Sequence, residues 1–390
     1  MSGFRESHLA PEAPIRVCFI ATGADLGGAP RSLLEMVKAL LETGRIDPYV
    51  MLRSGGMLED ALDGIGVCHE VFHFPSAVRS KRLPDAVKLA SFPVYERALA
   101  RRLRRGGFDI VHNNGVFYDV GVRAAKRAGI PCVCHIREYA QLENGIEFCD
   151  EGRVRESVGM ADRIIFISDG VAGRFDGWCD KDKATVLFNG FDVARYHRKH
   201  TPLFEGGCCR LLLAGHIMPT KGQMEAVRAL EVVRNRGYDA HLTIIGLVKD
   251  ADYHRAVVGF IEDRELWDSV DILEFSDDLG EVRAASDVSL ICSTANEGLG
   301  RVTVEGMLAG CLAIGSDAGG TAEIISNGET GLLYDAHDYL ALADRIEYAI
   351  CHRERMREIA ARGQAYALES FDSKRYADKL CALYRDILTD

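Results

Sequence analysis

Two glutamates eight positions apart define the most chemically specific segment of the sequence, EGLGRVTVEGMLAGCLAIGSDAGGTAEII at 297–325. Glu297 and Glu305 lie on either side of Gly300, and helical spacing of apolar residues predicts a helix that starts near Arg301. The N-terminus of a helix presents backbone N–H groups without intrahelical acceptors and the positive end of the helix dipole. The segment therefore predicts a binding site for a diphosphate.

The same segment resembles the retaining glycosyltransferases of family 4, which have the GT-B fold. Their hallmark is a pair of glutamates separated by seven residues, then a small-residue turn, a short apolar strand and a GG-x-x-E element, here Gly319, Gly320 and Glu323. The resemblance implies that Glu297 accepts hydrogen bonds from hydroxyls of the donor sugar and that Glu305 accepts both ribose hydroxyls. The alternative is that both glutamates only face solvent or cap the helix.

A second motif, GHIMPTKG at 215–222, lies between an expected strand and an expected helix, where the family has G-R followed by K-G. Lys221 takes the lysine position, and the resemblance implies that it neutralises the departing pyrophosphate. His216 takes the arginine position, which departs from the family. A neutral imidazole binds phosphate less strongly, so either His216 is protonated when the donor binds or another cation, such as Arg301, compensates. An ordinary loop histidine is the alternative.

The glycine-rich turn GADLGGAPRSLLE at 23–35 resembles the first loop of the family, where glycines let the backbone approach the donor phosphate and the acceptor. Gly27 and Gly28 are the candidates. Such turns also follow the first strand of NAD-binding domains, but the full G-x-G-x-x-G fingerprint is absent. A purely structural role for the two glycines stays open.

The segment CHIREY at 134–139 follows an expected strand on the face that would line the cleft. The family often has a histidine here that contacts the donor sugar near its anomeric carbon, and the resemblance assigns this role to His135. Arg137 and Glu138 could shape the acceptor pocket or form a structural ion pair. His135 could equally be a core residue with satisfied hydrogen bonds.

The resemblance thus implies three catalytic residues, His135, Lys221 and Glu297, and neither a metal nor a cofactor. The predicted donor-binding residues are Gly27, Gly28, His216, Lys221, Glu297, Gly298, Leu299, Gly300, Arg301, Val302 and Glu305. Asp250 and Asp252 form a D-x-D pair that resembles a metal motif of another glycosyltransferase fold. Because the pair lies at an expected helix start, we interpret it as a helix N-cap.

Short apolar runs alternate with helical patterns along the whole chain, which predicts parallel sheets covered by helices on both faces. The expected strands are 15–23, 48–52, 109–113, 131–136, 163–167, 184–188, 210–215, 241–246, 271–275, 288–292 and 311–315. The fold class is α/β, with two Rossmann-like domains facing across a cleft. A polar stretch at 189–207 predicts the boundary between an acceptor-binding domain at 1–200 and a nucleotide-sugar-binding domain at 201–370. The segment 371–390 is an expected helix that could pack back on the first domain.

The 390-residue chain has an ordinary globular composition, with 47% hydrophobic and 27% charged residues. Its net charge of −11 disfavours nucleic acid as a partner. No apolar run approaches the roughly 20 residues of a membrane span. The twelve cysteines show no C-x-x-C spacing, so we expect reduced thiols and a cytoplasmic protein.

One stretch, 79–105, is locally basic. Its nine cations are Arg79, Lys81, Arg82, Lys88, Arg97, Arg101, Arg102, Arg104 and Arg105, against two acidic residues, Asp85 and Glu96. Leu99, Leu103 and Ala98 lie among the arginines, as in an interfacial helix, which suggests peripheral contact with an anionic membrane at the inner face of the cell. A solvated helix face is the alternative.

The sequence as a whole predicts a retaining, metal-independent glycosyltransferase that takes a sugar from a UDP- or GDP-linked donor. The acceptor would be a glycan, a lipid-linked molecule or a small molecule with a hydroxyl group. A nucleotide-sugar 2-epimerase and a non-catalytic nucleotide-sugar-binding protein are the alternatives. The spaced glutamate pair argues against the epimerase.

Overall fold

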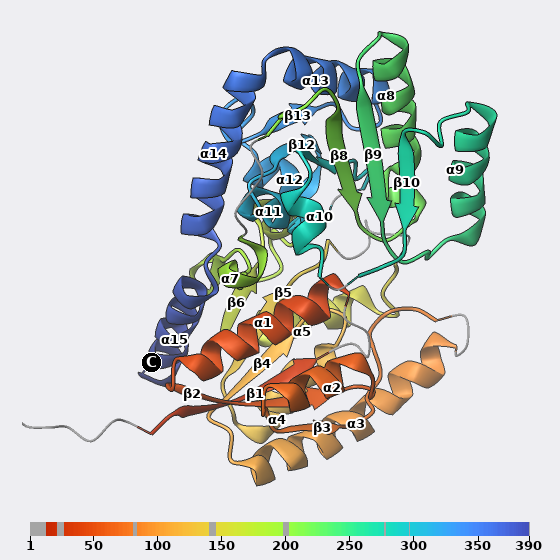
Figure 1. Ribbon diagram of the computed structural model, residues 1–390. Coiled ribbons are helices and arrows are strands. Elements are labelled where there is room, and N and C mark those ends of the chain that lie inside the picture. Colours follow the sequence, from red (N-terminus) through yellow and green to blue (C-terminus); the bar gives the residue numbers. More distant parts are fainter. Residues whose placement is uncertain are drawn as a thin grey trace, which may run out of the picture.

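The protein consists of two parallel β-sheets, each covered by helices on both faces, stacked end to end (Figure 1). The computed structural model describes residues 13–21, 27–80, 84–139, 146–197, 203–276, 278–295 and 297–389. All pairings between neighbouring strands are parallel in both sheets. The α/β fold expected from the sequence is confirmed.

The N-terminal sheet has seven strands in the order β3-β2-β1-β4-β5-β6-β7. Its strands are β1 (Ile15–Ala21), β2 (Ile46–Leu52), β3 (His69–Val71), β4 (Ile110–Asn114), β5 (Cys132–Ile136), β6 (Arg163–Phe166) and β7 (Ala184–Val186). The helices of this half are α1 (Gly28–Glu42), α2 (Met57–Gly64), α3 (Asp85–Gly106), α4 (Asp119–Ala128), α5 (Glu151–Met160), α6 (Asp169–Arg174) and α7 (Val193–Tyr196).

The C-terminal sheet has six strands in the order β10-β9-β8-β11-β12-β13. Its strands are β8 (Cys209–Ala214), β9 (Ala240–Ile245), β10 (Val270–Leu273), β11 (Val288–Ile291), β12 (Leu312–Ser316) and β13 (Leu332–Tyr334). The helices are α8 (Gln223–Asn235), α9 (Ala251–Asp263), α10 (Gly280–Ala284), α11 (Arg301–Leu308), α12 (Gly319–Ile324), α13 (Tyr339–Cys351), α14 (Arg353–Ser370) and α15 (Ser373–Thr389).

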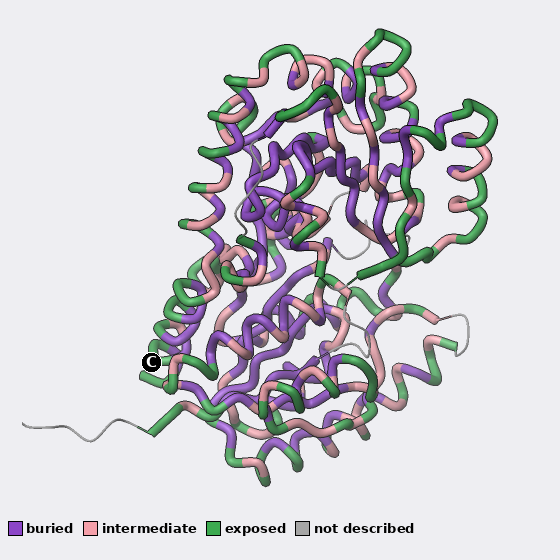
Figure 2. The backbone as a smooth tube through the Cα atoms, viewed as in Figure 1, coloured by how far each residue is buried: buried purple, intermediate pink, exposed green. Residues whose placement is uncertain are grey.

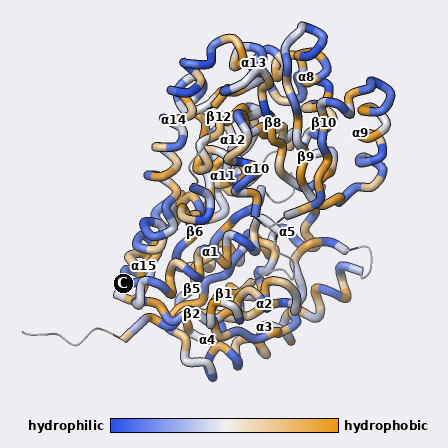
Figure 3. The backbone as a smooth tube through the Cα atoms, in the orientation of Figure 1, coloured by the Kyte–Doolittle hydropathy of each residue, from blue (hydrophilic) through white to orange (hydrophobic). Residues whose placement is uncertain are grey.

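The central strands are apolar along their whole length because helices cover both of their faces. In β1 every residue from Val17 to Ala21 is fully buried. Helix α1 shows the matching pattern, since Leu33, Met36, Val37 and Leu40 lie on one buried face at helical spacing. Figures 2 and 3 show the result for both halves: buried, apolar strands in the interior and outer helices with one polar, exposed face.

The strands expected from the sequence are present, and two further strands, β3 and β13, extend the sheets at their edges. Each has three residues, too few to show a period. In both sheets the strand order reverses next to the first strand, between β1 and β4 and between β8 and β11. Parallel α/β sheets bind ligands at the carboxyl ends of the strands at such points.

The last helix, α15, lies against α1 of the N-terminal half, after α14 has run down the side of the molecule from the C-terminal half (Figure 1). Tyr376, Leu380 and Tyr384 of α15 belong to the same buried cluster as Val17 and Leu33. The chain therefore crosses between the two halves twice. The predicted domain boundary at residue 200 falls outside the described residues.

The basic stretch 79–105 maps mainly to α3, which lies on the outside of the N-terminal sheet. The prediction that Leu99 and Leu103 lie on a membrane-contacting face of the helix is wrong, because both side chains are fully buried and pack into the core. Their spacing of four is the spacing of the inward face of a helix. Lys81 and Arg82 lie outside the described residues. Among the residues the structure describes, no helix is both long and apolar enough to span a membrane.

Candidate active site

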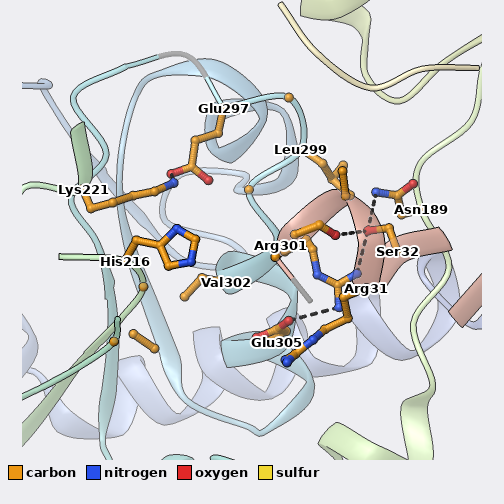
Figure 4. A pocket seen from close by; sticks show the side chains of 18 of the residues that line it. Arg31, Ser32, Asn189, His216, Lys221, Glu297, Leu299, Arg301, Val302 and Glu305 are labelled. Carbon is orange, nitrogen blue, oxygen red and sulfur yellow. Dashed lines mark hydrogen bonds and ion pairs between the residues drawn. The ribbon is translucent and has the colours of Figure 1, made fainter. Parts of the chain in front are cut away.

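A cavity of about 280 Å³ lies between the carboxyl ends of the two sheets and is lined by both halves (Figure 4). The N-terminal half contributes the start of α1 and the residues that follow β5 and β6. The C-terminal half contributes the loops after β8 and β9, part of α10 and the start of α11. Every predicted donor-binding residue lines this cavity: Gly27, Gly28, His216, Lys221, Glu297, Gly298, Leu299, Gly300, Arg301, Val302 and Glu305.

Helix α11 begins at Arg301, as the sequence predicts, and its first turn forms one wall of the cavity. Gly300 is the N-cap residue and has a left-handed backbone, with φ of 75°. A side chain here would be strained, and its Cβ would lie 2.8 Å from Oγ1 of Thr321. Glycine thus allows the sharp turn that brings the N-terminus of α11 to the cavity wall, where the first N–H groups of a helix lack intrahelical acceptors.

Lys221 and Glu297 form an ion pair on the C-terminal wall, with 2.6 Å between Nζ and Oε1. The hydroxyl of Ser293 also donates to this carboxylate. Burial alone would raise the pKa of Glu297, but the neighbouring lysine outweighs it, and the pKa lies below its usual value. Both side chains keep access to the cavity, with 28% of Lys221 and 21% of Glu297 exposed. An ammonium group and a carboxylate therefore stand side by side, each able to bind a substrate group.

Glu305 lies one turn into α11, between two arginines. Its Oε2 accepts from Nη2 of Arg283 at 2.5 Å, and its Oε1 accepts from Nη2 of Arg301 at 3.2 Å. Burial would raise the pKa of the carboxyl, but the two guanidinium groups lower it further, so the pKa is depressed. Glu305 is thus an ionised acceptor at the cavity wall.

Arg301 joins the two halves of the molecule. Its guanidinium contacts Glu35 of α1 at 3.1 Å, the Tyr196 hydroxyl at 3.0 Å and the Ser32 hydroxyl at 2.8 Å (Figure 4 shows the contacts to Ser32 and Glu305). The charges of Glu35 and Glu305 raise its pKa despite burial. Both terminal nitrogens of Arg301 thus contact carboxylates. The contacts of Arg301 with these carboxylates do not favour the idea that Arg301 compensates for the family arginine that His216 replaces. The compensation by Arg301 stays a prediction.

His216 lines the cavity beside Lys221, directly after β8 (Figure 4). Its carbonyl oxygen accepts from the buried amide of Gln223 at 2.9 Å, which fixes the loop to the start of α8. The position expected for a phosphate-binding group is therefore occupied by an imidazole, on a loop that is hydrogen-bonded to α8.

Comparison with known proteins assigns both halves to one kind of enzyme. The model described as Glycosyltransferase Family 4 matches residues 26–195, and the model described as Glycosyl transferases group 1 matches residues 206–366. The chain is a family 4 glycosyltransferase. Its two-domain architecture is the GT-B fold.

Individual relatives of this glycosyltransferase agree with the assignment. D-inositol 3-phosphate glycosyltransferase of Pseudarthrobacter chlorophenolicus is 26% identical over 355 residues, which cover 83% of this chain and 82% of that protein. The structure of HepE from Anabaena in complex with UDP superimposes with a TM-score of 0.81 at 22% identity, covering 95% of this chain and all of that one. A glycosyltransferase of Rickettsia africae gives 0.82 at 19% identity, covering 97% and 99%. These comparisons do not favour the epimerase or the non-catalytic alternative.

The glycosyltransferase does not present His135 to the cavity as the sequence suggested. His135 lies inside β5, is fully buried and is not among the cavity-lining residues. Its ring contacts His112 at 3.1 Å and Arg137 at 3.2 Å. Residues two apart on a strand share a face, and Arg137, just past the end of β5, is the one that reaches the cavity. The catalytic role implied for His135 stays a prediction.

The D-x-D pair of the glycosyltransferase is part of a helix start. Asp250 is the N-cap of α9, and its side chain accepts from the backbone N–H of Tyr253 at 2.9 Å. Asp252 pairs with Arg255 one turn along. The N-cap interpretation is confirmed. Over the described ranges, no group of three or more histidine, cysteine or acidic side chains is placed to hold a metal ion.

Several cavity residues of the glycosyltransferase were not among the predicted site residues, although Arg31 and Ser32 lie within the glycine-rich segment 23–35. Arg283 comes from the short helix α10, and Ser32 and Arg31 come from α1. The side chain of Asn189 also lines the cavity, and its amide nitrogen donates to the Ser32 hydroxyl at 3.4 Å. No local motif marks Arg283 or Asn189, because the tertiary fold alone brings them to the cavity.

The charges of the lining suit an anionic substrate. Among the described residues, five positively charged side chains and two carboxylates line the cavity. The cations are Arg31, Arg137, Lys221, Arg283 and Arg301, and the carboxylates are Glu297 and Glu305. In a partly enclosed site such an excess of positive charge attracts and holds an anion such as a diphosphate.

Proposed function

We propose that this glycosyltransferase moves a sugar from a nucleoside diphosphate sugar to a hydroxyl acceptor with retention of the anomeric configuration. The observation that carries the proposal is the convergence of the α11 N-terminus, Lys221 and Glu297 on one cavity between the two domains. Among the candidate donors, UDP-sugars come before GDP-sugars, because the similar Anabaena structure holds UDP.

The donor diphosphate binds at the start of α11, where backbone N–H groups and the helix dipole stabilise its charge. Lys221 lies beside Glu297 and can turn to the diphosphate as negative charge builds up on the leaving oxygen. Glu297 then accepts hydrogen bonds from hydroxyls of the sugar. The reaction uses no protein nucleophile, and the departing phosphate guides the incoming hydroxyl group.

Glu305 binds the ribose of the donor. Its two contacts with Arg283 and Arg301 leave lone pairs on both oxygens, because each carboxylate oxygen accepts more than one hydrogen bond. Its low pKa keeps it an acceptor at neutral pH. The two arginines fix the carboxylate in place, so ribose binding costs little side-chain entropy.

A two-stage experiment tests the proposal. First, thermal-shift measurements with UDP, GDP, ADP and TDP and their common sugar conjugates, with and without EDTA, compare the wild type with Glu305→Ala. We expect one nucleotide to raise the melting temperature, with no effect of EDTA and with loss in the variant. No shift with any nucleotide would contradict the donor assignment.

In the second stage, the donor found is incubated with candidate acceptors, and nucleoside diphosphate release and product are measured. Proton NMR of the product gives the configuration at the anomeric carbon, which should match that of the donor. An inverted product would refute the retaining mechanism. Donor binding without any turnover would favour the non-catalytic alternative, and a free epimer without acceptor would favour the epimerase.

We also propose that α3 docks on an anionic membrane surface. Its outward side carries the exposed Val87 and Val94, followed by the exposed Arg97 and Arg101. A short apolar stretch next to cations suits the boundary of an anionic bilayer, where each cation near the surface contributes about 1 kcal/mol. The proposed membrane-contacting face is therefore the outward side of α3 and not the side that carries Leu103, which is buried.

Cosedimentation with liposomes tests the docking. Binding should require anionic lipid, weaken with salt and decrease in the Arg97→Gln/Arg101→Gln double variant. Arg355→Gln, which replaces an exposed arginine of α14 in the C-terminal domain, provides a control for the loss of an arginine. Equal binding to neutral liposomes, or none to either kind, would reject membrane docking.

A further inference from the structure

Arg137 is a buried cation at the cavity wall whose side-chain partners are all neutral. It is 5% exposed. Its Nε donates to Oδ1 of Asn114 at 2.6 Å, its Nη1 donates to Oδ1 of Asn189, and its Nη2 lies 3.2 Å from Nδ1 of His135 and 3.6 Å from Sδ of Met36. Within the described ranges no carboxylate contacts the guanidinium.

Among the described residues, the next acidic side chain in the sequence forms no ion pair with the Arg137 guanidinium, although its charge partly offsets the lowering of the Arg137 pKa by burial. Glu138 follows directly in the chain, but its carboxylate accepts from the backbone N–H groups of Val116 and Arg137. Two other cavity cations differ in this respect, because Lys221 pairs with Glu297 and Arg301 pairs with Glu35. Within the part of the chain that the structure describes, Arg137 thus differs from both in that its guanidinium forms no ion pair with a carboxylate.

The hydrogen bonds that link Arg137 to His135, His112 and Tyr384 indicate which ring nitrogens of the two histidines carry a proton. A guanidinium can only donate, so Nδ1 of His135 accepts. Nε2 of His112, 3.1 Å from that same nitrogen, then donates. Nδ1 of His112 must accept, and the hydroxyl of Tyr384 on α15 donates to it at 2.7 Å. Both imidazoles are neutral in this chain, so they hold the guanidinium in place without adding charge to it.

Burial agrees with the neutral assignment. It lowers the pKa of His112 to about 3 and lowers the pKa of His135 as well, with the charge of Arg137 acting in the same direction. The side chains behind Arg137 thus offer orientation but no counter-charge. A buried cation that keeps its charge without a counter-charge gives up much of its hydration, so a binding anion gains strongly from it.

Arg137 lies next to the diphosphate-binding helix start. The loop before α11 packs against the backbone of Arg137 so closely that a Cβ on Gly298 would lie 2.4 Å from the Arg137 carbonyl oxygen. Arg137 belongs to the N-terminal domain and α11 to the C-terminal domain. An anion between them would contact both domains at once.

We propose that Arg137 binds an oxyanion of a substrate, and that the Tyr384–His112–His135 chain is there to position its guanidinium. The oxyanion is either the diphosphate of the donor or a phosphate or carboxylate group on the acceptor. The proposal rests on the proposed function, because it names a further residue of the same site. Arg137 thus adds a cation of the N-terminal half to the anion-binding site.

The experiment compares the wild type with Arg137→Gln, Lys221→Met and Arg97→Gln. The last variant removes an exposed arginine of α3 and serves as the matched control. Calorimetric titration with UDP gives the affinity for a diphosphate. Titration with inorganic phosphate, alone and at saturating UDP, shows whether a second anion binds.

If Arg137 binds the donor diphosphate, Arg137→Gln weakens UDP binding at least tenfold, whereas Arg97→Gln leaves it within twofold. If it binds an acceptor anion, UDP affinity is kept, but phosphate binding at saturating UDP is lost. The proposal is wrong if Arg137→Gln binds UDP and phosphate like the wild type, or if the wild type binds neither.

The proposed function has a separate mode of failure. If UDP binding falls in Lys221→Met but not in Arg137→Gln, and phosphate binding is also intact, the donor site stands and only the role of Arg137 is refuted. If the wild type binds phosphate through Arg137 but no nucleotide, the proposed function fails instead.

A measurement on the wild-type protein keeps the proposal testable if Arg137→Gln does not fold. The Nε–Hε NMR signal of Arg137, assigned by its absence in Arg137→Lys, should shift during titration with UDP or phosphate. A signal that stays in place while another arginine signal shifts would refute the proposal.

Discussion

The Glu35–Arg301 contact predicts that one buried carboxylate on α1 holds the two domains together. Glu35 is only 6% exposed, and its carboxylate contacts both terminal nitrogens of Arg301 at 3.1 Å. Two unit charges about 4 Å apart attract each other by about 4 kcal/mol at an effective dielectric constant of about 20. Removal of one partner of a buried ion pair typically costs about 3–5 kcal/mol.

We expect Glu35→Gln to lower the free energy of unfolding by about 3 kcal/mol, near the lower end of that range. The amide oxygen of glutamine can still accept a hydrogen bond, and Arg301 keeps its contact with Glu305 at 3.2 Å. The matched control is Lys38→Met on the same helix. Lys38 pairs with Asp192 at 2.8 Å, but 43% of the lysine is exposed, so its loss should cost less than about 1 kcal/mol.

Urea unfolding followed by tryptophan fluorescence measures these effects, because Trp178 lies in the N-terminal half and Trp267 in the C-terminal half. The double variant Glu35→Gln/Arg301→Met should show a coupling energy of more than about 1.5 kcal/mol between the two sites. Equal costs for Glu35→Gln and Lys38→Met, together with additive effects in the double variant, would refute the reasoning.

Three further predictions concern burial, protonation and capping. Leu103→Ala should lower the free energy of unfolding in urea by about 2–5 kcal/mol, because Leu103 is fully buried. Val94→Ala should lower it by less than about 1 kcal/mol, because Val94 is exposed. Similar losses in the two variants would contradict the packing of α3. His112 has a pKa of about 3 when folded and about 6.5 when unfolded, so the unfolded chain takes up the proton first as the pH falls. His112 alone should lower the stability by about 2 kcal/mol from pH 7.5 to 5.0, and His135, whose pKa is also lowered, acts in the same direction. His112→Gln should therefore reduce the pH dependence without abolishing it, and an unchanged dependence in urea unfolding would contradict the burial of a neutral His112. Asp250→Ala should lower the free energy of unfolding by about 1 kcal/mol, because α9 loses its N-cap, and it should leave nucleotide affinity unchanged. A loss of nucleotide affinity that a divalent metal restores would contradict the N-cap interpretation.

Local patterns were sufficient to predict most of the architecture. The strands follow from apolar runs, and the start of α11 follows from Gly300 and the helical spacing after it. Lys221 and Glu297 belong to motifs that follow neighbouring strands, so their meeting at one edge of the sheet follows from the topology. These inferences need no knowledge of contacts between distant segments.

Contacts between distant segments decide what the sequence could not predict. Glu35 and Arg301 are far apart in the chain, and only the packing of α1 against the C-terminal half joins them. The choice between His135 and Arg137 depends on where β5 ends, because both face the same side of the sheet and only the residue past the end of the strand reaches the cavity. Strand ends are fixed by tertiary packing.

Calorimetric titration of the wild type and Lys221→Met with UDP, UDP-sugars and their GDP counterparts, in the presence of EDTA, tests the central claim most directly. The account predicts that one nucleotide binds the wild type without metal and that the Lys221 variant binds it at least tenfold more weakly, a difference of about 1.4 kcal/mol. A folded wild-type protein that binds none of these nucleotides, or a Lys221 variant that binds with unchanged affinity, would contradict it.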